Sequence, residues 1–128
     1  MAFEFSNYSV KITRVANGDL SASQYRFVKL STTDTVAVCT GATDIPIGVL
    51  QNAPTTGQEA EILIIGGTKI EAGEALAIGD ALGIVANGRG AAANTTTEYT
   101  LGTVLSAVAA AGEVATAVIN CANPVIRN

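Results

Sequence analysis

The segment from Ile64 to Asp80, IIGGTKIEAGEALAIGD, decides how the rest of the chain is interpreted. It combines four glycines with one lysine and three acidic residues, which is compatible with a phosphate-binding loop, a carrier hairpin or the turns of a β-barrel. A phosphate loop, G-x-x-x-x-G-K-[ST], needs its lysine directly after a glycine and a helix after that. Thr68 stands between Gly67 and Lys69, and no helical pattern follows. The segment therefore does not predict a phosphate site.

The same segment fits the turns of a small β-barrel. Gly66 and Gly67 predict a strand-to-strand turn, because glycine adopts the positive φ angles that tight turns need. A short strand follows, and then two corners in which a glycine precedes an acidic residue, Gly73–Glu74 and Gly79–Asp80. On this interpretation the segment is a piece of a fold made of short strands and turns.

Short alternating or apolar runs, separated by turn residues, recur along the whole chain. Many short strands at such regular spacing predict a β-barrel or a β-sandwich. The expected strands are residues 9–15, 25–30, 35–40, 46–51, 59–65, 81–86, 99–105 and 113–120. The best helix candidate, Leu105–Ala111, is too short to form a helix by itself. We therefore expect a small, all-β single domain.

Two stretches of the chain resemble each other. GVLQNAPTTGQEAEILI begins at Gly48, and GTVLSAVAAAGEVATAVI begins at Gly102. Their alignment matches Leu50 with Leu105, Gly57 with Gly112, Ala60 with Ala115 and Ile64 with Ile119. In each copy a strand ends in Val-Leu, and a glycine-containing turn leads into a second strand. The repeat predicts two related hairpins within one barrel, not two domains.

Length and composition favour one domain with an aliphatic core. A chain of 128 residues buries roughly two-thirds of the surface that it exposes when unfolded, so it needs neither a disulfide nor a metal to fold. Apolar residues make up 48% of the chain, with three Phe, three Tyr and no Trp. Cys39 and Cys121 lie in apolar segments. We expect two reduced, buried cysteines, with a disulfide as the alternative.

The charge pattern argues against several classes of function. The net charge is −4, and the seven Lys and Arg residues are scattered along the sequence. Nucleic-acid binding needs clustered cations, so we expect no DNA or RNA partner. No apolar run reaches the ~18 residues of a membrane span, and we expect no membrane partner. Residues 1–11 have neither a basic start nor an apolar run, so we expect no signal peptide and synthesis in a cytoplasm.

The side chains that carry most enzyme chemistry are missing or isolated. The chain has no histidine, which excludes Ser-His-Asp, Cys-His and His-based zinc sites. Two cysteines are too few for a zinc site made of cysteines alone. Glu71, Glu74 and Asp80 follow no calcium-loop spacing, and we expect solvated carboxylates in turns. The sequence predicts a protein that is not an enzyme and that binds no metal or cofactor.

A carrier domain is an alternative that the sequence leaves open. Lipoyl and biotinyl domains share the rhythm of glycine-acid turns around a short strand that Gly73–Glu74 and Gly79–Asp80 show. They carry the cofactor on a lysine at a hairpin tip, in D-K-A or M-K-M, and no such tripeptide occurs in this chain. Another small β-barrel binding module, such as a glycan-binding adhesin fragment, also stays open, although the chain lacks the surface aromatic residues that glycan sites usually use.

The start of the chain differs in character from the rest. Phe3, Phe5 and Tyr8 place half of the aromatic residues in an N-terminal arm, residues 1–9, which precedes a single barrel domain, residues 10–128. The arm has too few other apolar residues to build an element of the core. It either plugs its own barrel or docks onto a partner, where buried aromatic side chains often supply the anchors.

A pattern of turn glycines and small apolar residues extends over about residues 10–120. Its parts are Gly18-Asp19…Val28, Ile47-Gly48-Val49, Ala53…Gly57…Gly66, Ala72-Gly73…Gly79-Asp80-Ala81-Leu82 and Gly102-Thr103-Val104…Gly112…Val118. This pattern resembles the small Gly/Ala-rich capsid decoration, or cement, proteins of tailed bacteriophages. The shared motifs are turn and packing positions, so the resemblance carries over no functional side chain.

The resemblance implies a structural virion protein that binds the outer surface of a phage head and stabilises the expanded capsid. Its partners would be the major capsid protein and further copies of itself, most simply as a trimer, with a dimer as the alternative. It would be made in the bacterial host cytoplasm and reside in the virion. The arm would lie on the capsid protein and could add a strand to one of its sheets.

The stretch 86–98, ANGRGAAANTTTE, is low in large apolar residues and rich in Gly, Ala and Thr. It predicts a long exposed loop or a β-excursion. On the decoration hypothesis this loop either contacts a neighbouring subunit, with Asn87, Arg89 and Asn94 as the candidate contact residues, or faces outward.

Overall fold

The computed structural model describes residues 9–95 and 97–126, which form strands, turns, loops and one short 3-10 turn. In chain order the elements are β1 (Val10–Ala16), β2 (Phe27–Leu30), β3 (Thr35–Val38), β4 (Gly48–Leu50), β5 (Glu59–Glu71), β6 (Ala81–Ile84), η1 (Ala86–Gly88), β7 (Gly90–Ala92), β8 (Tyr99–Thr100), β9 (Gly102–Val104), β10 (Val114–Asn120) and β11 (Val125–Ile126). Within these residues nine strands form one mixed sheet, and β8 pairs with β11. The predicted all-β fold in a small single domain is confirmed.

The first five strands close into a ring, which we call the first barrel. They pair in the order β1-β3-β2-β4-β5, and β5 pairs in turn with β1. The β1–β3 pairing is parallel and the other four pairings are antiparallel. The ring therefore has no free sheet edge between β5 and β1, which closure alone achieves.

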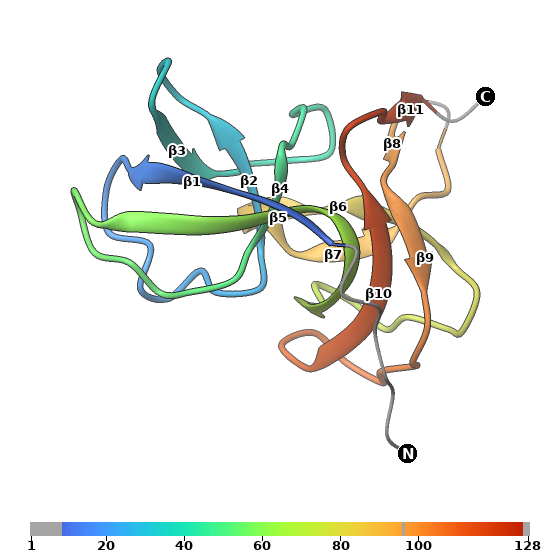
Figure 1. The fold of residues 1–128 in the computed structure, drawn as a ribbon. Coiled ribbons are helices and arrows are strands. Elements are labelled where there is room, and N and C mark those ends of the chain that lie inside the picture. Colours follow the sequence, from blue (N-terminus) through green and yellow to red (C-terminus); the bar gives the residue numbers. More distant parts are fainter. Residues whose placement is uncertain (1–8, 96, 127–128) are drawn as a thin grey trace.

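A second barrel repeats this arrangement and shares β5 with the first. The part of β5 before Ile65 pairs with β1 and β4, and the part after it pairs with β10. The order continues through β9 and β6 to β7, and a parallel bridge between Ala72 and Gly90 closes this ring. In Figure 1, β5 runs from the barrel on the left into the barrel on the right, where β10 and β9 lie beside it.

The two barrels are equivalent in their pairing and in their backbone hydrogen bonds. The N–H of Leu50 donates to the carbonyl of Arg26 in the first barrel, and the N–H of Val104 donates to the carbonyl of Asp80 in the second. The two hairpins that the sequence repeat predicted are present as β4–β5 and β9–β10, but they lie in two barrels and not in one, and Leu50 corresponds to Val104 instead of Leu105. The likeness also extends beyond these hairpins, because each ring uses the same order of parallel and antiparallel pairs.

Side-chain alternation along the strands divides the apolar residues between two cores. The core inside the first barrel contains Ala16, Leu20, Val28, Val36, Leu50, Ala60 and Ile62. The alternate residues Phe27, Val49 and Leu63 belong to a larger core, which they share with residues of the second barrel such as Leu82 and Ile119. Consecutive residues in β2, in β4 and in the first part of β5 are thus buried in different cores, and this packing fixes the second barrel against the first.

The predicted Gly66–Gly67 turn is wrong, because both glycines lie inside β5. The expected strand 59–65 continues to Glu71, and its partner changes at Ile65 from β1 to β10. Gly66 has a φ of 138°, and a Cβ atom there would lie 2.7 Å from the Ser9 Oγ. The glycine pair lets the strand bend between the barrels without ending it. A local sequence signal cannot distinguish such a bend from a turn, since the difference lies in the distant pairing partner.

Three other expectations can be compared with the structure. The segment Leu105–Ala111, which is too short for a helix by itself, is not helical, and Val108 within it forms an antiparallel bridge with Leu76. The stretch 86–98 forms the predicted β-excursion and not the alternative long exposed loop, because it contains η1 and β7, and Ala91 and Ala93 are buried. The expected strand 99–105 divides into β8 and β9 around a buried leucine. In each case a partner that is distant in the sequence decides the local structure.

The two cysteines are reduced and buried, as the sequence predicted. Cys39 and Cys121 belong to the same apolar core. Burial raises the pKa of each thiol to about 12, which keeps both in the protonated, unreactive form. They act as small apolar side chains.

Candidate functional site

The residues predicted for contacts belong to the N-terminal arm and to the stretch 86–98. Phe3, Phe5 and Tyr8 lie outside the described residues. Asn87 and Asn94 are exposed on either side of β7. Arg89 lies between them in the sequence, but its side chain is partly buried and forms an ion pair with Glu71.

Arg89 belongs to a charged cluster at the junction of the two barrels. The Glu71 carboxylate lies 2.9 Å from a guanidinium nitrogen of Arg26 and 3.5 Å from one of Arg89. The Lys69 ammonium lies over the ring of Tyr25, 5.7 Å from its centroid. The expectation that Glu71 is a solvated turn carboxylate is therefore wrong, since it ends β5 and joins a cation of each barrel. The sequence could not reveal this cluster, because its members come from distant segments.

The other acidic residues of the opening segment are turn carboxylates, as predicted. Glu74 accepts a hydrogen bond from the N–H of Ala92, and Asp80 accepts one from the N–H of Ala77. Such hydrogen bonds hold the backbone of a turn in one conformation, and they need no metal ion to do so. Within residues 9–95 and 97–126, no group of three or more Cys, Asp or Glu side chains is arranged to hold a metal.

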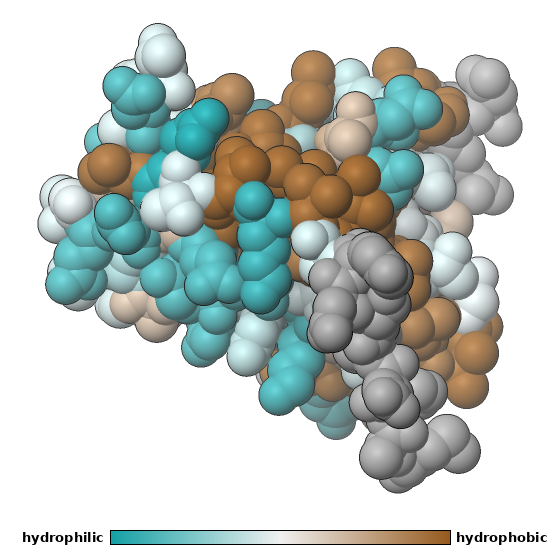
Figure 2. Space-filling model, viewed as in Figure 1, coloured by the Kyte–Doolittle hydropathy of each residue, from teal (hydrophilic) through white to brown (hydrophobic). Residues whose placement is uncertain are grey.

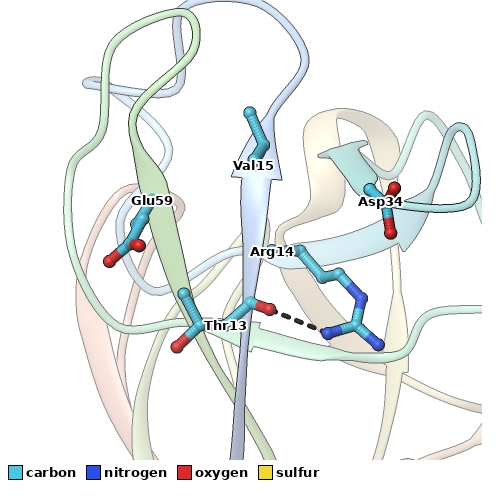
Figure 3. Close-up of a pocket in the computed structure, with 5 residues that line it drawn as sticks. All are labelled: Thr13, Arg14, Val15, Asp34 and Glu59. Carbon is cyan, nitrogen blue, oxygen red and sulfur yellow. Dashed lines mark hydrogen bonds between the residues drawn. The ribbon is translucent and has the colours of Figure 1, made fainter.

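A groove of about 360 Å³ opens at one end of the first barrel. It is lined by Thr13, Arg14, Val15, Asp34 and Glu59 (Figure 3). The Arg14 guanidinium group donates through Nη1 to the carbonyl of Thr13, at 2.8 Å. The Nε of Arg14 has no hydrogen-bond partner among the described residues. The groove combines one cation with two carboxylates and a hydroxyl, and it is open to solvent. This arrangement suits polar contacts with another surface.

Arg14 occupies a position that is apolar in the second barrel. It faces Ala60 across the β1–β5 pair, and Ile70 faces Ala115 across the equivalent β5–β10 pair. Ile70 is fully buried. At this position Ile70 closes the second barrel with an aliphatic side chain, whereas the first barrel ends in a polar groove that contains Arg14.

The lysines do not have the geometry that a carrier domain needs. Lys11, Lys29 and Lys69 lie within β1, β2 and β5, and none is at a hairpin tip. Lys11 pairs with Glu61, and Lys29 pairs with Asp44, each at 3.0 Å. A swinging cofactor needs a lysine on an exposed turn, so this geometry does not support a lipoyl or biotinyl carrier.

Asp44 fixes the turn between β3 and β4, and this predicts a pH effect. Its Oδ2 accepts hydrogen bonds from the Thr40 N–H, the Thr40 hydroxyl and the Lys29 ammonium. The backbone bond from Thr40 and then the bond from Lys29 lower the pKa of Asp44 from 3.8 to about 2. Because the pKa is lower in the folded state, the stabilisation is complete above the unfolded pKa and is lost as the pH falls through the folded one.

We therefore expect the wild-type protein to lose roughly 1 kcal/mol more than Asp44→Asn between about pH 5 and pH 2, with solvent screening included. Urea unfolding of both proteins across this range measures the difference. Parallel stability curves for the two proteins would contradict the role given to Asp44.

Several large apolar side chains are exposed on the surface. They are Val10, Val15, Leu30, Ile45, Ile78, Val114, Val118, Val125 and Ile126. Figure 2 shows hydrophobic surface where β1 crosses β5 toward β10, and more of it at the lower right, beside the connection from β5 to β6. Apolar surface that gathers in patches indicates contact with other macromolecules. No helix of the described chain is long and apolar enough to cross a membrane.

These features define an all-β fold of two barrels joined through one strand. No model of a known protein family matches the chain, and no curated protein sequence does. Among solved structures it is similar to the crystal structure of the head fiber gp8.5 N base of bacteriophage phi29, with a TM-score of 0.68 and 18% sequence identity. The match covers 88% of this chain and 95% of that one. At this identity the likeness establishes a shared fold.

Proposed function

We propose that this protein is a structural component of a tailed-phage head, which binds the outer surface of the shell and stabilises it as a decoration, or cement, protein. The observation that carries the proposal is the likeness to the base of a phage head fiber, which extends over nearly the whole of both chains. The turn pattern in the sequence, which resembles that of capsid decoration proteins, is independent support.

The composition and the surface are consistent with this role. Charged residues are 14% of the chain, against about a quarter in average soluble proteins, so much of the surface is suited to be covered by partners. The partners on this proposal are the major capsid protein and other copies of the chain, as a trimer. Many copies with weak contacts at symmetric positions bind firmly together, because each contact raises the effective concentration of the next. The protein would then reside on the outside of the virion head.

Co-sedimentation with expanded, undecorated heads of the phage that encodes the chain tests the proposal. We expect saturable binding at a fixed number of copies per hexamer, and decorated heads that resist heat better than bare ones. Heads of an unrelated phage are the control for non-specific adsorption. Absence of binding to intact heads, with a folded protein, would reject the decoration function.

The N-terminal arm gives a second prediction within this proposal. Removing Met1–Ser9 should lower the affinity for heads at least about tenfold, because the change removes the aromatic anchors Phe3, Phe5 and Tyr8. The barrels should stay folded, since β1 begins at Val10. Co-sedimentation and thermal unfolding of the truncated protein measure the two effects.

The same experiment separates the two interpretations of the arm. If the arm plugs its own barrel, the truncation should lower the unfolding temperature and change head binding little. If the arm docks onto the shell, the unfolding temperature should change little while binding is lost. Wild-type affinity together with wild-type stability would contradict both.

A further inference from the structure

The end of the second barrel carries an exposed apolar surface made by two neighbouring loops. The connection from β5 to β6 and the connection from β9 to β10 are joined by two hydrogen bonds between Leu76 and Val108, each 3.0 Å long. In Figure 1 they lie at the end of this barrel opposite β8 and β11. Six exposed apolar side chains of these loops form a surface that we call the apolar tip: Ala75, Ala77, Ile78, Ala109, Ala110 and Ala111.

Ile78 is the most prominent member of the apolar tip. It is 73% exposed, the highest value among the large apolar residues of the described chain. Its loop is nevertheless held in place: the N–H of Gly79 donates to the carbonyl of Val104, and that of Ala77 donates to the Asp80 carboxylate. A fixed loop presents the isoleucine at a constant position, so a partner would lose little conformational entropy in burying it.

The first barrel shows that this loop architecture does not require an apolar surface. The Leu20 N–H donates to the Pro54 carbonyl there, as the Leu76 N–H donates to the Val108 carbonyl in the second barrel. The first-barrel loops read SASQ and QNAPTT, whereas the second-barrel loops read ALAIG and AVAAA. Corresponding loops, joined by one such bond in the first barrel and by two in the second, thus carry polar side chains in one barrel and apolar ones in the other. Folding alone does not account for the apolar tip.

The charged residues within the two loops of the apolar tip are all negative. Glu74, Asp80 and Glu113 border it, and residues 72–88 and 102–126 contain no Lys or Arg. The three carboxylates are turned back onto backbone N–H groups of Ala92, Ala77 and Ala109, which leaves the centre of the surface uncharged. An apolar centre with an acidic rim complements an apolar centre with a basic rim. A second copy of the same surface would place like charges opposite each other.

We propose that the apolar tip is a docking surface for a partner protein whose contact face is apolar at its centre and bordered by lysine or arginine. The inference rests on the proposed function, in that the face belongs to the phage head. It adds a contact that is separate from the N-terminal arm. Ile78 is the anchor, the alanines permit close approach, and the acidic rim fixes the orientation and raises the rate of encounter.

Four aspartate variants of the full-length protein test this inference. Ile78→Asp and Ala111→Asp place a charge in the apolar tip. Ala22→Asp and Thr56→Asp place the same charge on exposed positions of the equivalent first-barrel loops and are the matched controls. Binding to expanded heads is measured by co-sedimentation at several salt concentrations, and thermal unfolding checks that each variant is folded. Ile78→Ser is included in case the aspartate variant does not fold.

We expect both tip variants to lose at least about tenfold in affinity for heads and both controls to bind as the wild type does. Wild-type binding should weaken as salt is raised from about 0.05 M to 0.5 M, because the rim attraction is screened. Equal binding by the wild type and all the variants would overturn the inference and leave the decoration function standing. No binding by the wild type would reject the decoration function, and the inference with it.

The same variants also test whether the apolar tip binds a second copy of the protein. If sedimentation equilibrium shows that Ile78→Asp dissociates an oligomer while head binding is retained, a second copy occupies the apolar tip. That result would overturn the choice of a basic-rimmed partner.

Discussion

Replacing Gly102 with alanine should destabilise the protein by about 3 kcal/mol, a large part of the roughly 5–15 kcal/mol that holds a domain of this size together. A Cβ atom at Gly102 would overlap the carbonyl oxygen of Val118 and would lie 2.9 Å from the Ile119 Cα. Both are backbone atoms of β10, which cannot move without breaking its pairing with β9 and β5. Alanine would gain about 0.5–1 kcal/mol from a less flexible unfolded chain, and the overlap outweighs this gain.

Gly48 should behave in the same way, because it occupies the equivalent place in the first barrel. A Cβ atom there would overlap the carbonyl oxygen of Leu63 and approach the Ile62 side chain to 2.6 Å. Each hairpin thus has a glycine that lets the short strand pass close to the long one. Equivalent losses at both positions would show that the two barrels share this constraint.

Gly41→Ala is the control for both substitutions. A Cβ atom at Gly41 meets nothing within 4 Å, so we expect a change within about 0.5 kcal/mol. The free energies of unfolding come from urea titrations with the slopes compared. A loss below about 1 kcal/mol for Gly102→Ala would show that β9 and β10 can separate more easily than their packing suggests.

Glu71→Ala should cost about 2 kcal/mol. The side chains of Glu71 and Arg26 are only 21% and 20% exposed, so this ion pair lies between a surface pair and a buried one. The Nε atoms of Arg26 and Arg89 already lack a hydrogen-bond partner among the described residues. Removing the carboxylate would leave two partly buried guanidinium groups without the negative charge that they share.

Glu61→Ala is the matched control, because Glu61 lies on the same strand and also forms an ion pair. Its pair with Lys11 is about half exposed, at 46% and 50% for the two side chains, and we expect a change within about 0.5 kcal/mol. Urea unfolding of the two variants measures the difference. Equal losses would mean that the cluster at the barrel junction contributes no more than an ordinary surface pair.

Much of the fold follows from local sequence. The strands expected at residues 9–15, 35–40 and 113–120 occur within a few residues of their predicted limits as β1, β3 and β10. Alternation of apolar and polar side chains marks them because each has one face toward a core. The internal repeat can also be recognised in the sequence, because glycines such as Gly57 and Gly112 recur at corresponding turns.

The sequence did not reveal that the segment around Gly66 and Gly67 is part of a long strand shared by both barrels. A Gly-Gly pair predicts a turn on local grounds, yet here it bends a strand that continues for 13 residues in total. The continuation depends on β10, which follows it by more than forty residues and replaces β1 as its partner. For the same reason the expected single barrel is two barrels that share a strand.

The sequence by itself determined the class of fold, the aliphatic core and the absence of histidine chemistry. These properties depend on composition and on short-range alternation, which do not change with the path of the chain. Only the tertiary structure decided which charges meet and which apolar residues stay exposed. Arg26, Glu71 and Arg89 form one cluster, and Ile78 and Ala111 share one surface, because closing two barrels on a common strand brings together residues that are far apart in the sequence.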